Sequence, residues 1–220
     1  MRGTILITLI LVFVFGCAPT HFVKPLDKKQ SAVNVSLGGP LIKYNELTIP
    51  IPFVTTTYGY GIDSSLTGFA SANVTSALYG NLQMDIGATK LLTRQVGIFP
   101  AISISPLLNV IYRNKETKKL YPQLDINSYW ECGRNKNLVY VGIDNWFELS
   151  KKKAYEMKQK NHWFFSPMIG YTLVRNRYCI NIEAKVIAPN KSNEKLVVEY
   201  QTPFNNSGAF GVYVGYTRKF

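Results

Sequence analysis

His21 and His162 are the only histidines in the chain, so any chemistry that uses an imidazole depends on these two side chains. Ser166 follows His162 by four residues, and Glu148 and Glu183 supply carboxylates in the same half of the chain. A histidine that takes the proton of a serine, while a carboxylate orients its ring, activates that serine for attack on an acyl group. These side chains are therefore the candidate set for acyl hydrolysis.

His162 also fits a structural role. The residues that follow it include Trp163 and Phe165, and aromatic side chains are typical of the boundary between a membrane and water. Because the spacing specifies no nucleophile, we expect this interfacial role and no enzymatic activity, with the hydrolase as the alternative.

The three cysteines, Cys17, Cys132 and Cys179, form neither a CxxC pair nor a cluster with histidine. We therefore expect no metal site and no other cofactor. Alternation places Cys132 on an apolar face and Cys179 on a polar face, so a disulfide between them would need a bulge. Whether they pair stays open.

The elements that must position these residues are strands, because period-two alternation recurs from Ser31 onward and long helical periodicity is nearly absent. Many segments reach the roughly nine to eleven residues that a tilted strand needs to cross a bilayer. We predict an all-β fold, a single antiparallel up-and-down β-barrel of about eight to ten strands. The predicted strands are Ser31–Leu37, Phe53–Ile62, Leu66–Ser76, Asn81–Leu91, Val96–Tyr112, Tyr121–Arg134, Asn137–Leu149, His162–Arg175, Tyr178–Ile187 and Gly208–Phe220.

The connections between these strands alternate in length, with the brief Ala77–Gly80 as an exception. Outer-membrane barrels have this asymmetry, because their periplasmic turns are tight and their outer loops are free to grow. The long connections are Gly38–Pro52, Arg113–Leu120, Ser150–Asn161 and Ala188–Ser207, and the short ones are Asp63–Ser65, Leu92–Gln95, Asn135–Lys136 and Asn176–Arg177.

The two faces of the strands differ in polarity. In Asn81–Leu91, Leu82 and Ile86 share one face, and Gln83 and Asp85 share the other. The lysines lie mainly in connections, which favours a polar face turned into a barrel and an apolar face turned to lipid. The alternative is a soluble lipocalin-like lipoprotein that faces the periplasm, binds an apolar ligand and has an oily interior.

A set of charged residues is expected in the barrel interior. These side chains could line a path for a solute, but a lumen of about ten strands is narrow enough for side chains to fill. We therefore favour a salt-bridged filling. The set comprises Asp85, Asp125, Asp144, Glu148, Glu183 and Lys185.

The net charge of +12 would ordinarily suggest nucleic acid as a partner. An exported chain meets little nucleic acid, so we expect membrane lipid, lipopolysaccharide or another envelope protein instead. One long connection concentrates lysines that could bind lipopolysaccharide phosphates or an acidic partner, and a plain solvated loop is an equal alternative. These lysines are Lys151, Lys152, Lys153, Lys158 and Lys160.

The first twenty residues have the features of an export signal, because Arg2 precedes the apolar run Thr4–Phe15, which is too short to span a bilayer. The stretch 14–17, Val-Phe-Gly-Cys, resembles a lipobox. That resemblance implies a signal peptide of residues 1–16 and a lipid on Cys17; cleavage after Ala18 is the alternative. Residues 17–30 would then be a lipidated N-terminus and a tether without fixed structure, and residues 31–220 the barrel domain.

The last strand places Phe210, Val212, Val214 and Tyr216 on one face and ends in Phe220. It resembles the C-terminal signature of outer-membrane β-barrels, small Gram-negative barrels of the OmpA and OmpW sort. The resemblance implies an outer-membrane location, extracellular long connections and a lipid on Cys17 in the inner leaflet beside the barrel. A histidine and a serine at the rim of such a barrel also resemble the site of lipid A deacylases.

Overall fold

The computed structural model describes residues 19–44, 47–114, 117–151, 159–193, 198–204 and 206–220. Among these residues, no helix is long and apolar enough to cross a membrane. The elements are β1 (Ser31–Tyr44), β2 (Leu47–Pro50), β3 (Phe53–Asp63), β4 (Leu66–Asn73), α2 (Val74–Leu78), β5 (Leu82–Thr93), β6 (Ala101–Asn114), β7 (Thr117–Cys132), β8 (Asn137–Phe147), β9 (Trp163–Val174), β10 (Tyr178–Ser192) and β11 (Ser207–Lys219).

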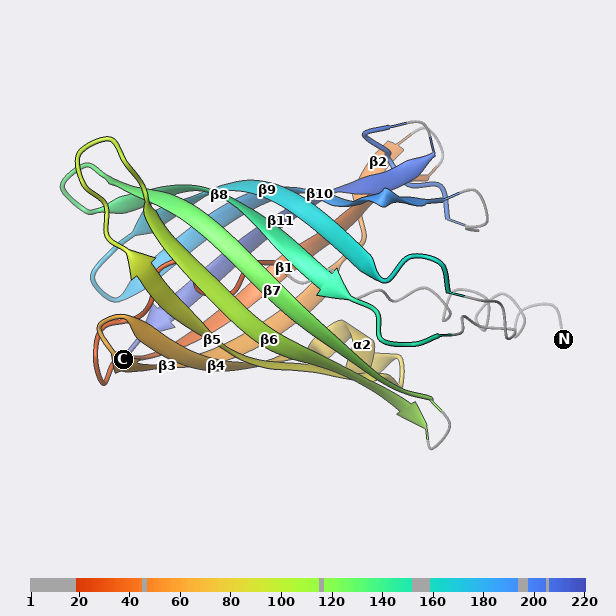
Figure 1. Cartoon of the computed structure of the whole chain (residues 1–220), viewed down its shortest axis with the longest axis horizontal. Helices are drawn as coiled ribbons and strands as arrows, with labels where there is room; N and C mark the ends of the chain where they lie inside the picture. The colour runs from red at the N-terminus through yellow and green to blue at the C-terminus, as the bar shows by residue number, and fades with distance from the viewer. Residues whose placement is uncertain (1–18, 45–46, 115–116, 152–158, 194–197, 205) are drawn as a thin grey trace, which may run out of the picture.

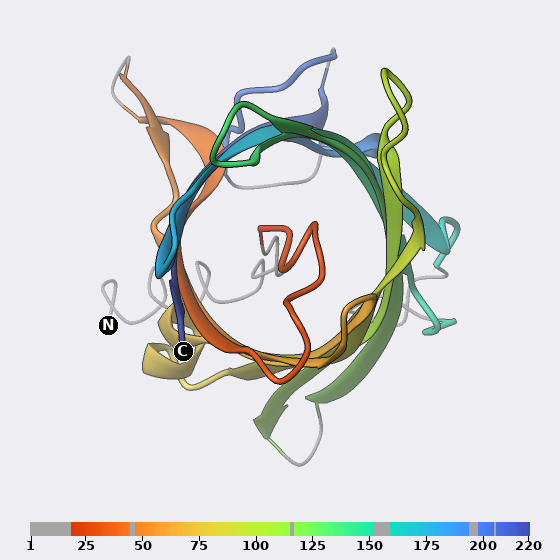
Figure 2. The same cartoon turned by 90° about the vertical axis from the view of Figure 1, so that its left-hand side faces the viewer.

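Ten of these strands close into a barrel in which each strand pairs antiparallel with its neighbours in the chain (Figures 1 and 2). The barrel closes between the first and last strands, with β1–β11 pairing from Ala32 opposite Lys219 to Pro40 opposite Gly211. Closure leaves no free edge in the wall, because each of its ten strands has two partners. The predicted all-β, up-and-down barrel is confirmed, and each of the ten predicted strands corresponds to one strand of the wall.

Two elements were not predicted. The strand β2 extends the sheet beyond the barrel by pairing with the outer end of β1, from Leu41 opposite Pro50 to Tyr44 opposite Leu47. The short helix α2 replaces the end of the predicted strand Leu66–Ser76. The side chain of Asn73 accepts a hydrogen bond from the amide of Ser76, and this N-cap turns the chain out of the sheet.

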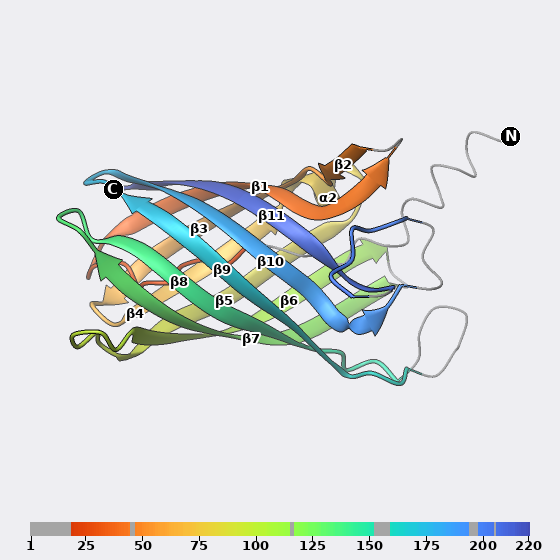
Figure 3. The ribbon, with the colours of Figure 1, turned by 90° about the horizontal axis from the view of Figure 1, so that it is seen from above.

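The two ends of the barrel differ in the length of most of their connections, but two predicted lengths are wrong. The connection between β5 and β6 spans residues 94–100, and the predicted long connection Arg113–Leu120 is mostly strand, because β6 and β7 stay paired up to Asn114 and Thr117. The connections between β3 and β4, β5 and β6, β7 and β8, and β9 and β10 lie at the end where the C-terminus lies (Figures 1 and 3). We call this the short-turn end. The β1–β2 hairpin, α2 and the connections that follow β6, β8 and β10 lie at the opposite, long-loop end.

The polar face of the wall points into the barrel and the apolar face points out. Ile86 is 61 % exposed and Ile182 is 54 % exposed, whereas the side chains of Asn127 and Glu183 have no exposed surface. The soluble lipocalin-like alternative is therefore wrong, because an oily interior would require the isoleucines to point inward. An outer surface of this kind is solvated by lipid, not by water.

The segment 19–30 lies inside the barrel, where its trace runs within the ring of strands (Figure 2). Phe22, Val23 and Leu26 are buried. The prediction of a tether without fixed structure is therefore wrong. The tether was inferred from the lysines of this stretch, but its few apolar side chains find apolar partners on the inner wall. We call residues 19–30 the N-terminal plug.

Candidate functional site in the barrel lumen

The N-terminal plug descends along the lumen from mid-height to the short-turn end, and each step is held by the wall. Its hydrogen bonds reach β10, β6, β4 and β3 in turn. They run from the amide of Thr20 to Glu183 Oε1 (3.3 Å), from the Ser103 hydroxyl to the carbonyl of Val23 (2.6 Å), from the amide of Leu26 to Thr67 Oγ1 (2.7 Å) and from the amide of Lys29 to the carbonyl of Gly61 (2.8 Å).

Apolar side chains of the plug meet the few apolar residues that point inward. Phe22 and Leu26 form one cluster with Phe69 and Leu107, and the rings of Phe22 and Phe69 have centroids 6.3 Å apart. A second cluster surrounds Val23 and consists of Ala101, Tyr129, Leu138 and Tyr140. Several exceptions to polar-inward alternation are therefore places where the plug finds an apolar neighbour.

His21 connects the plug to β5. Its ring stacks on Phe69 with centroids 4.5 Å apart, and its Nε2 atom lies 3.4 Å from Asp85 Oδ2. Both side chains are buried. Sequence reasoning placed Asp85 in the interior but missed its partner, because His21 was assigned to the tether.

At mid-height, the structure brings together three of the predicted interior residues. Lys185 Nζ lies 2.5 Å from Asp144 Oδ2 and 3.3 Å from Glu183 Oε1, and the Tyr140 hydroxyl donates a 2.9 Å hydrogen bond to Glu183 Oε2. All four side chains are buried. Two carboxylates and one ammonium group share a water-excluded space, so removal of one partner leaves a buried charge that has lost an ion pair.

Of the other two members of the predicted set, Asp125 lies directly across from Asp144 on the neighbouring strand β7, beside the ion-pair cluster, and Glu148 lies at the long-loop end. Asp125 accepts a 2.6 Å hydrogen bond from Gln123 Nε2, and Asn109 Nδ2 donates to Gln123 Oε1 at 2.8 Å. Glu148 follows the end of β8 and accepts a 2.8 Å hydrogen bond from the amide of Ser150. The amides at positions 109 and 123 were missed as partners, although their alternation with apolar residues marked them as inward-facing.

Every strand of the wall has an inward side chain that is packed against its neighbours. An open pore would leave inward side chains in contact with water, yet each of the ten wall strands contributes an inward side chain that is at most 5 % exposed. These residues are Ser36, Thr57, Ser71, Thr89, Ser103, Asn127, Tyr140, Met168, Glu183 and Tyr213.

The candidate catalytic side chains have separate partners. Nδ1 of His162 lies 2.8 Å from the backbone carbonyl oxygen of Glu148, not from its carboxylate. The hydroxyl of Ser166 accepts a 3.1 Å hydrogen bond from the amide of Ala188. Glu183 lies in the ion-pair cluster with Lys185. The structure therefore does not draw these residues into a hydrogen-bonded triad.

Several predicted positions lie at the edge of what the structure describes. Cys132 is exposed, Cys179 is buried, and both are free thiols, in keeping with their opposite faces. Lys151 and Lys160 are exposed at the base of the basic connection, whereas Lys152, Lys153 and Lys158 lie outside the described residues. The signal peptide 1–16 and Cys17 also lie outside them.

A closed antiparallel barrel with an apolar outside and a polar, filled inside defines the class of transmembrane β-barrels. No family model and no curated protein matches the chain.

Solved structures with a similar fold are outer-membrane and translocator barrels of very low sequence identity. An outer membrane channel from Pseudomonas putida F1 is 9 % identical, with 92 % of this chain and 100 % of that chain covered and a TM-score of 0.49. The translocator domain of the autotransporter NalP from Neisseria meningitidis is 11 % identical, with 100 % and 95 % covered and a TM-score of 0.38. Ail, the attachment invasion locus protein of Yersinia pestis, is 8 % identical, with 88 % and 99 % covered and a TM-score of 0.30.

Proposed function

We propose that this chain is an outer-membrane barrel of a Gram-negative bacterium, that its own N-terminal plug closes the lumen, and that it acts as a structural or binding component. The observation that carries this proposal is the fit of residues 19–30 into the lumen, with buried apolar side chains and hydrogen bonds to four wall strands. A barrel closed in this way offers solutes no free path and presents its two ends to partners.

The outer surface supports the membrane assignment. Exposed tyrosines lie toward both ends of the wall: Tyr44 and Tyr112 lie within two residues of the long-loop ends of β1 and β6, and Tyr60, Tyr171 and Tyr216 lie within four residues of the short-turn ends of their strands. Trp163 begins β9 at the long-loop end and is also exposed. Aromatic side chains at both ends of an apolar belt are typical of the two membrane–water interfaces.

The partners that we propose are membrane lipid around the belt and lipopolysaccharide or another envelope protein at the long-loop end. Lys151 and Lys160 supply exposed cations there, and the β1–β2 hairpin exposes Tyr44 and Leu47. A role as a binding component, and not as an enzyme, is supported by the separate hydrogen-bond partners of His162 and Ser166.

A lipid on Cys17 is part of the proposal only for a state in which the plug is withdrawn. Thr20 binds Glu183, which lies five residues above the first residue of β10 and so roughly 12 Å above the short-turn end. Three residues from Thr20 to Cys17 span at most about 11 Å. A lipid in the periplasmic leaflet outside the wall is therefore out of reach while the plug is seated.

Conductance in planar lipid bilayers tests the closed lumen. The full chain, shown to be folded by heat-modifiable migration in a detergent gel, should give no steady conductance. A variant with Phe22, Val23 and Leu26 replaced by serine should open, because the plug loses its apolar contacts. Steady conductance of the full chain would overturn the closed barrel. A triple variant that still gives no conductance would contradict the role of the plug, because the ion-pair cluster alone would then be enough to close the lumen.

A further inference from the structure

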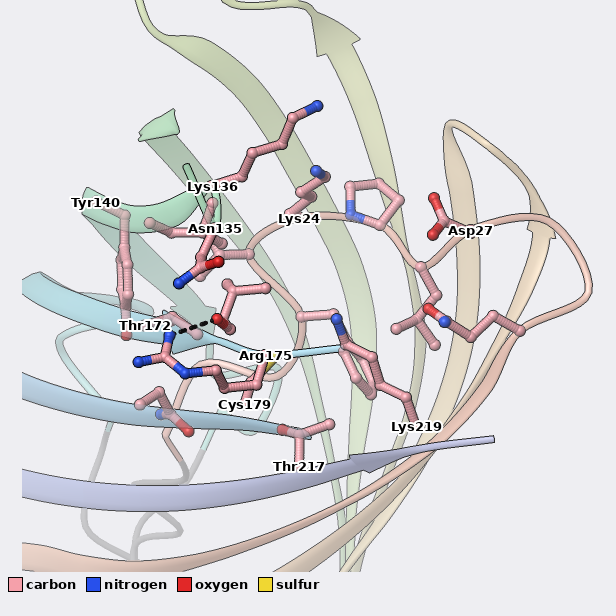
Figure 4. Close-up of a pocket in the computed structure, with 18 of the residues that line it drawn as sticks. Lys24, Asp27, Asn135, Lys136, Tyr140, Thr172, Arg175, Cys179, Thr217 and Lys219 are labelled. Atoms are coloured by element: carbon pink, nitrogen blue, oxygen red, sulfur yellow. Dashed lines mark hydrogen bonds between the residues drawn. The ribbon is translucent and has the colours of Figure 1, made fainter. Parts of the chain in front are cut away.

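A cavity of about 440 Å³ lies between the N-terminal plug and the short-turn ends of β8 to β11 (Figure 4). Its inner part is formed by side chains that are buried, among them Val23, Tyr140 and Cys179. Its volume falls within the range of roughly 300–1,000 Å³ that is typical of small-molecule sites. The plug therefore leaves one side of the lumen accessible to a ligand that arrives from the short-turn end.

The cavity has a strong excess of positive charge. Its described lining residues include five cations and one carboxylate, Asp27. Figure 4 shows Lys24, Lys136, Arg175 and Lys219 around this space. The five cations are Lys24, Arg134, Lys136, Arg175 and Lys219.

A nearby carboxylate neutralises part of this charge. Glu131 Oε1 lies 2.8 Å from Lys24 Nζ, and Glu131 Oε2 lies 3.6 Å from Lys136 Nζ. Within the part of the chain that the structure describes, Arg134, Arg175 and Lys219 form no ion pair. Three cations at one mouth therefore lack a countercharge.

Arg175 is held in place for binding. Its Nη1 atom donates a 2.8 Å hydrogen bond to the carbonyl of Val174, which fixes the guanidinium at the cavity and leaves further N–H groups available. The wall beside it is lined by the polar side chains of Thr172, Asn181 and Thr217. A guanidinium beside hydroxyl and amide groups is the donor set that recognises phosphate oxygens.

We propose that this cavity binds a phosphate-bearing anion presented from the short-turn side, either as a free solute or as the headgroup of an anionic lipid. The charge excess attracts the anion, Arg175 and Lys219 contact its phosphate oxygens, and the hydroxyl and amide groups of the wall donate further hydrogen bonds to these oxygens. An apolar ligand fits poorly, because the cations would lose hydration without gaining a partner. The site goes beyond closure of the lumen, since it depends on the cavity beside the plug and not on conductance.

Isothermal titration of the full chain in a nonionic detergent tests the site. We expect saturable binding of inorganic pyrophosphate that weakens as salt is added. The double variant Arg175→Gln, Lys219→Gln should bind at least about tenfold more weakly, in line with the loss of charge-assisted hydrogen bonds. Lys43→Gln, Arg113→Gln removes the same charge at the long-loop end, where both side chains are exposed, and should bind as the parent does.

Two further arms locate the site and identify its source of phosphate. Thr172→Phe fills the cavity without changing the charge and should abolish binding. In the second arm, mixed micelles that contain phosphatidylglycerol replace pyrophosphate. If the chain binds these micelles and does not bind pyrophosphate, the ligand is a lipid headgroup. Binding of neither probe would overturn the proposal. So would equal binding by Thr172→Phe, because the charge would then act as a diffuse surface. Both results are independent of conductance.

Discussion

The ring of Phe22 lies against the backbone of Gly59, in the space that a Cβ atom at position 59 would occupy. The carbonyl of Asp27 lies in the same way where a Cβ atom of Gly61 would be. Two inward positions of β3 are therefore glycines because the plug approaches the backbone there. The inner wall and residues 19–30 fit each other as one packed unit.

Replacement of Gly59 by leucine should displace the plug while the barrel stays intact. The new side chain overlaps the ring of Phe22, and the wall strand is held on both sides by β1 and β4. Hydrogen exchange at the amides of Leu26 and Lys29, which donate to the wall, should become fast, with heat-modifiable migration unchanged. Gly68→Leu is the matched control, since a Cβ at Gly68 meets only Ile62 at 3.6 Å. Plug amides that stay protected in Gly59→Leu would show that the seated plug does not require glycine at position 59.

Replacement of Asp144 by alanine should destabilise the barrel by about 3–5 kcal/mol, because Lys185 then stays buried with one carboxylate lost. Urea unfolding in lipid or detergent measures the change in the free energy of unfolding. The exposed Lys160→Ala is the control. The double variant Asp144→Leu, Lys185→Met removes both charges and should recover much of the loss. A cost below about 1 kcal/mol for Asp144→Ala would show that the pair is not desolvated as its burial indicates.

His21→Phe should loosen the plug although an aromatic ring at position 21 can still stack on Phe69. Asp85 loses the ring nitrogen that lies 3.4 Å away and stays buried. A buried polar group without its partner costs about 1–3 kcal/mol. The amide of Leu26, which donates to Thr67 Oγ1, should therefore exchange faster by about one to two orders of magnitude. Asp85→Asn in the same background should restore part of the protection. An unchanged Leu26 amide in His21→Phe would show that the apolar contacts alone hold the plug in place.

Lipidation of Cys17 and a seated plug should not occur in the same molecule. Mass spectrometry of the mature N-terminus identifies the lipid, and hydrogen exchange of the Leu26 amide reports the plug in the same preparation. A lipidated chain should show fast exchange at Leu26, and a chain without lipid should show slow exchange. Cys17→Ser is the matched control and should be fully protected. A lipidated chain with a protected Leu26 amide would refute the limit set by chain length.

The strand pattern could be predicted from the sequence because a strand's alternation is local. Gln83, Asp85 and Ile86 mark inward and outward faces without knowledge of any partner strand. The excess of lysines in connections predicted that the apolar face meets lipid, and in the structure the apolar face points outward. Alternating connection lengths likewise gave the two ends of the barrel, because each connection is a property of consecutive strands.

The contents of the lumen were decided by tertiary structure. Asp144 and Lys185 meet because Asp144 lies opposite Ser166 and Lys185 opposite Met168, two residues further along β9. A slip of two residues in either register would keep every side chain on its face and still separate this pair. Alternation therefore predicts that such residues point inward, but not which of them touch.

The plug could not be predicted either, because its contacts also join residues that lie far apart in the chain. Residues 19–30 have no repeating pattern, and their hydrogen bonds to the wall join residues 31 to 163 positions apart in the chain, from Gln30 with Gly61 to Thr20 with Glu183. Their lysines and small number of apolar side chains resemble a solvated tether when taken alone. The sequence by itself determined a closed wall with a polar interior. Only the folded barrel could determine what fills that interior, because burial of Phe22, Val23 and Leu26 requires a wall that exists only after closure.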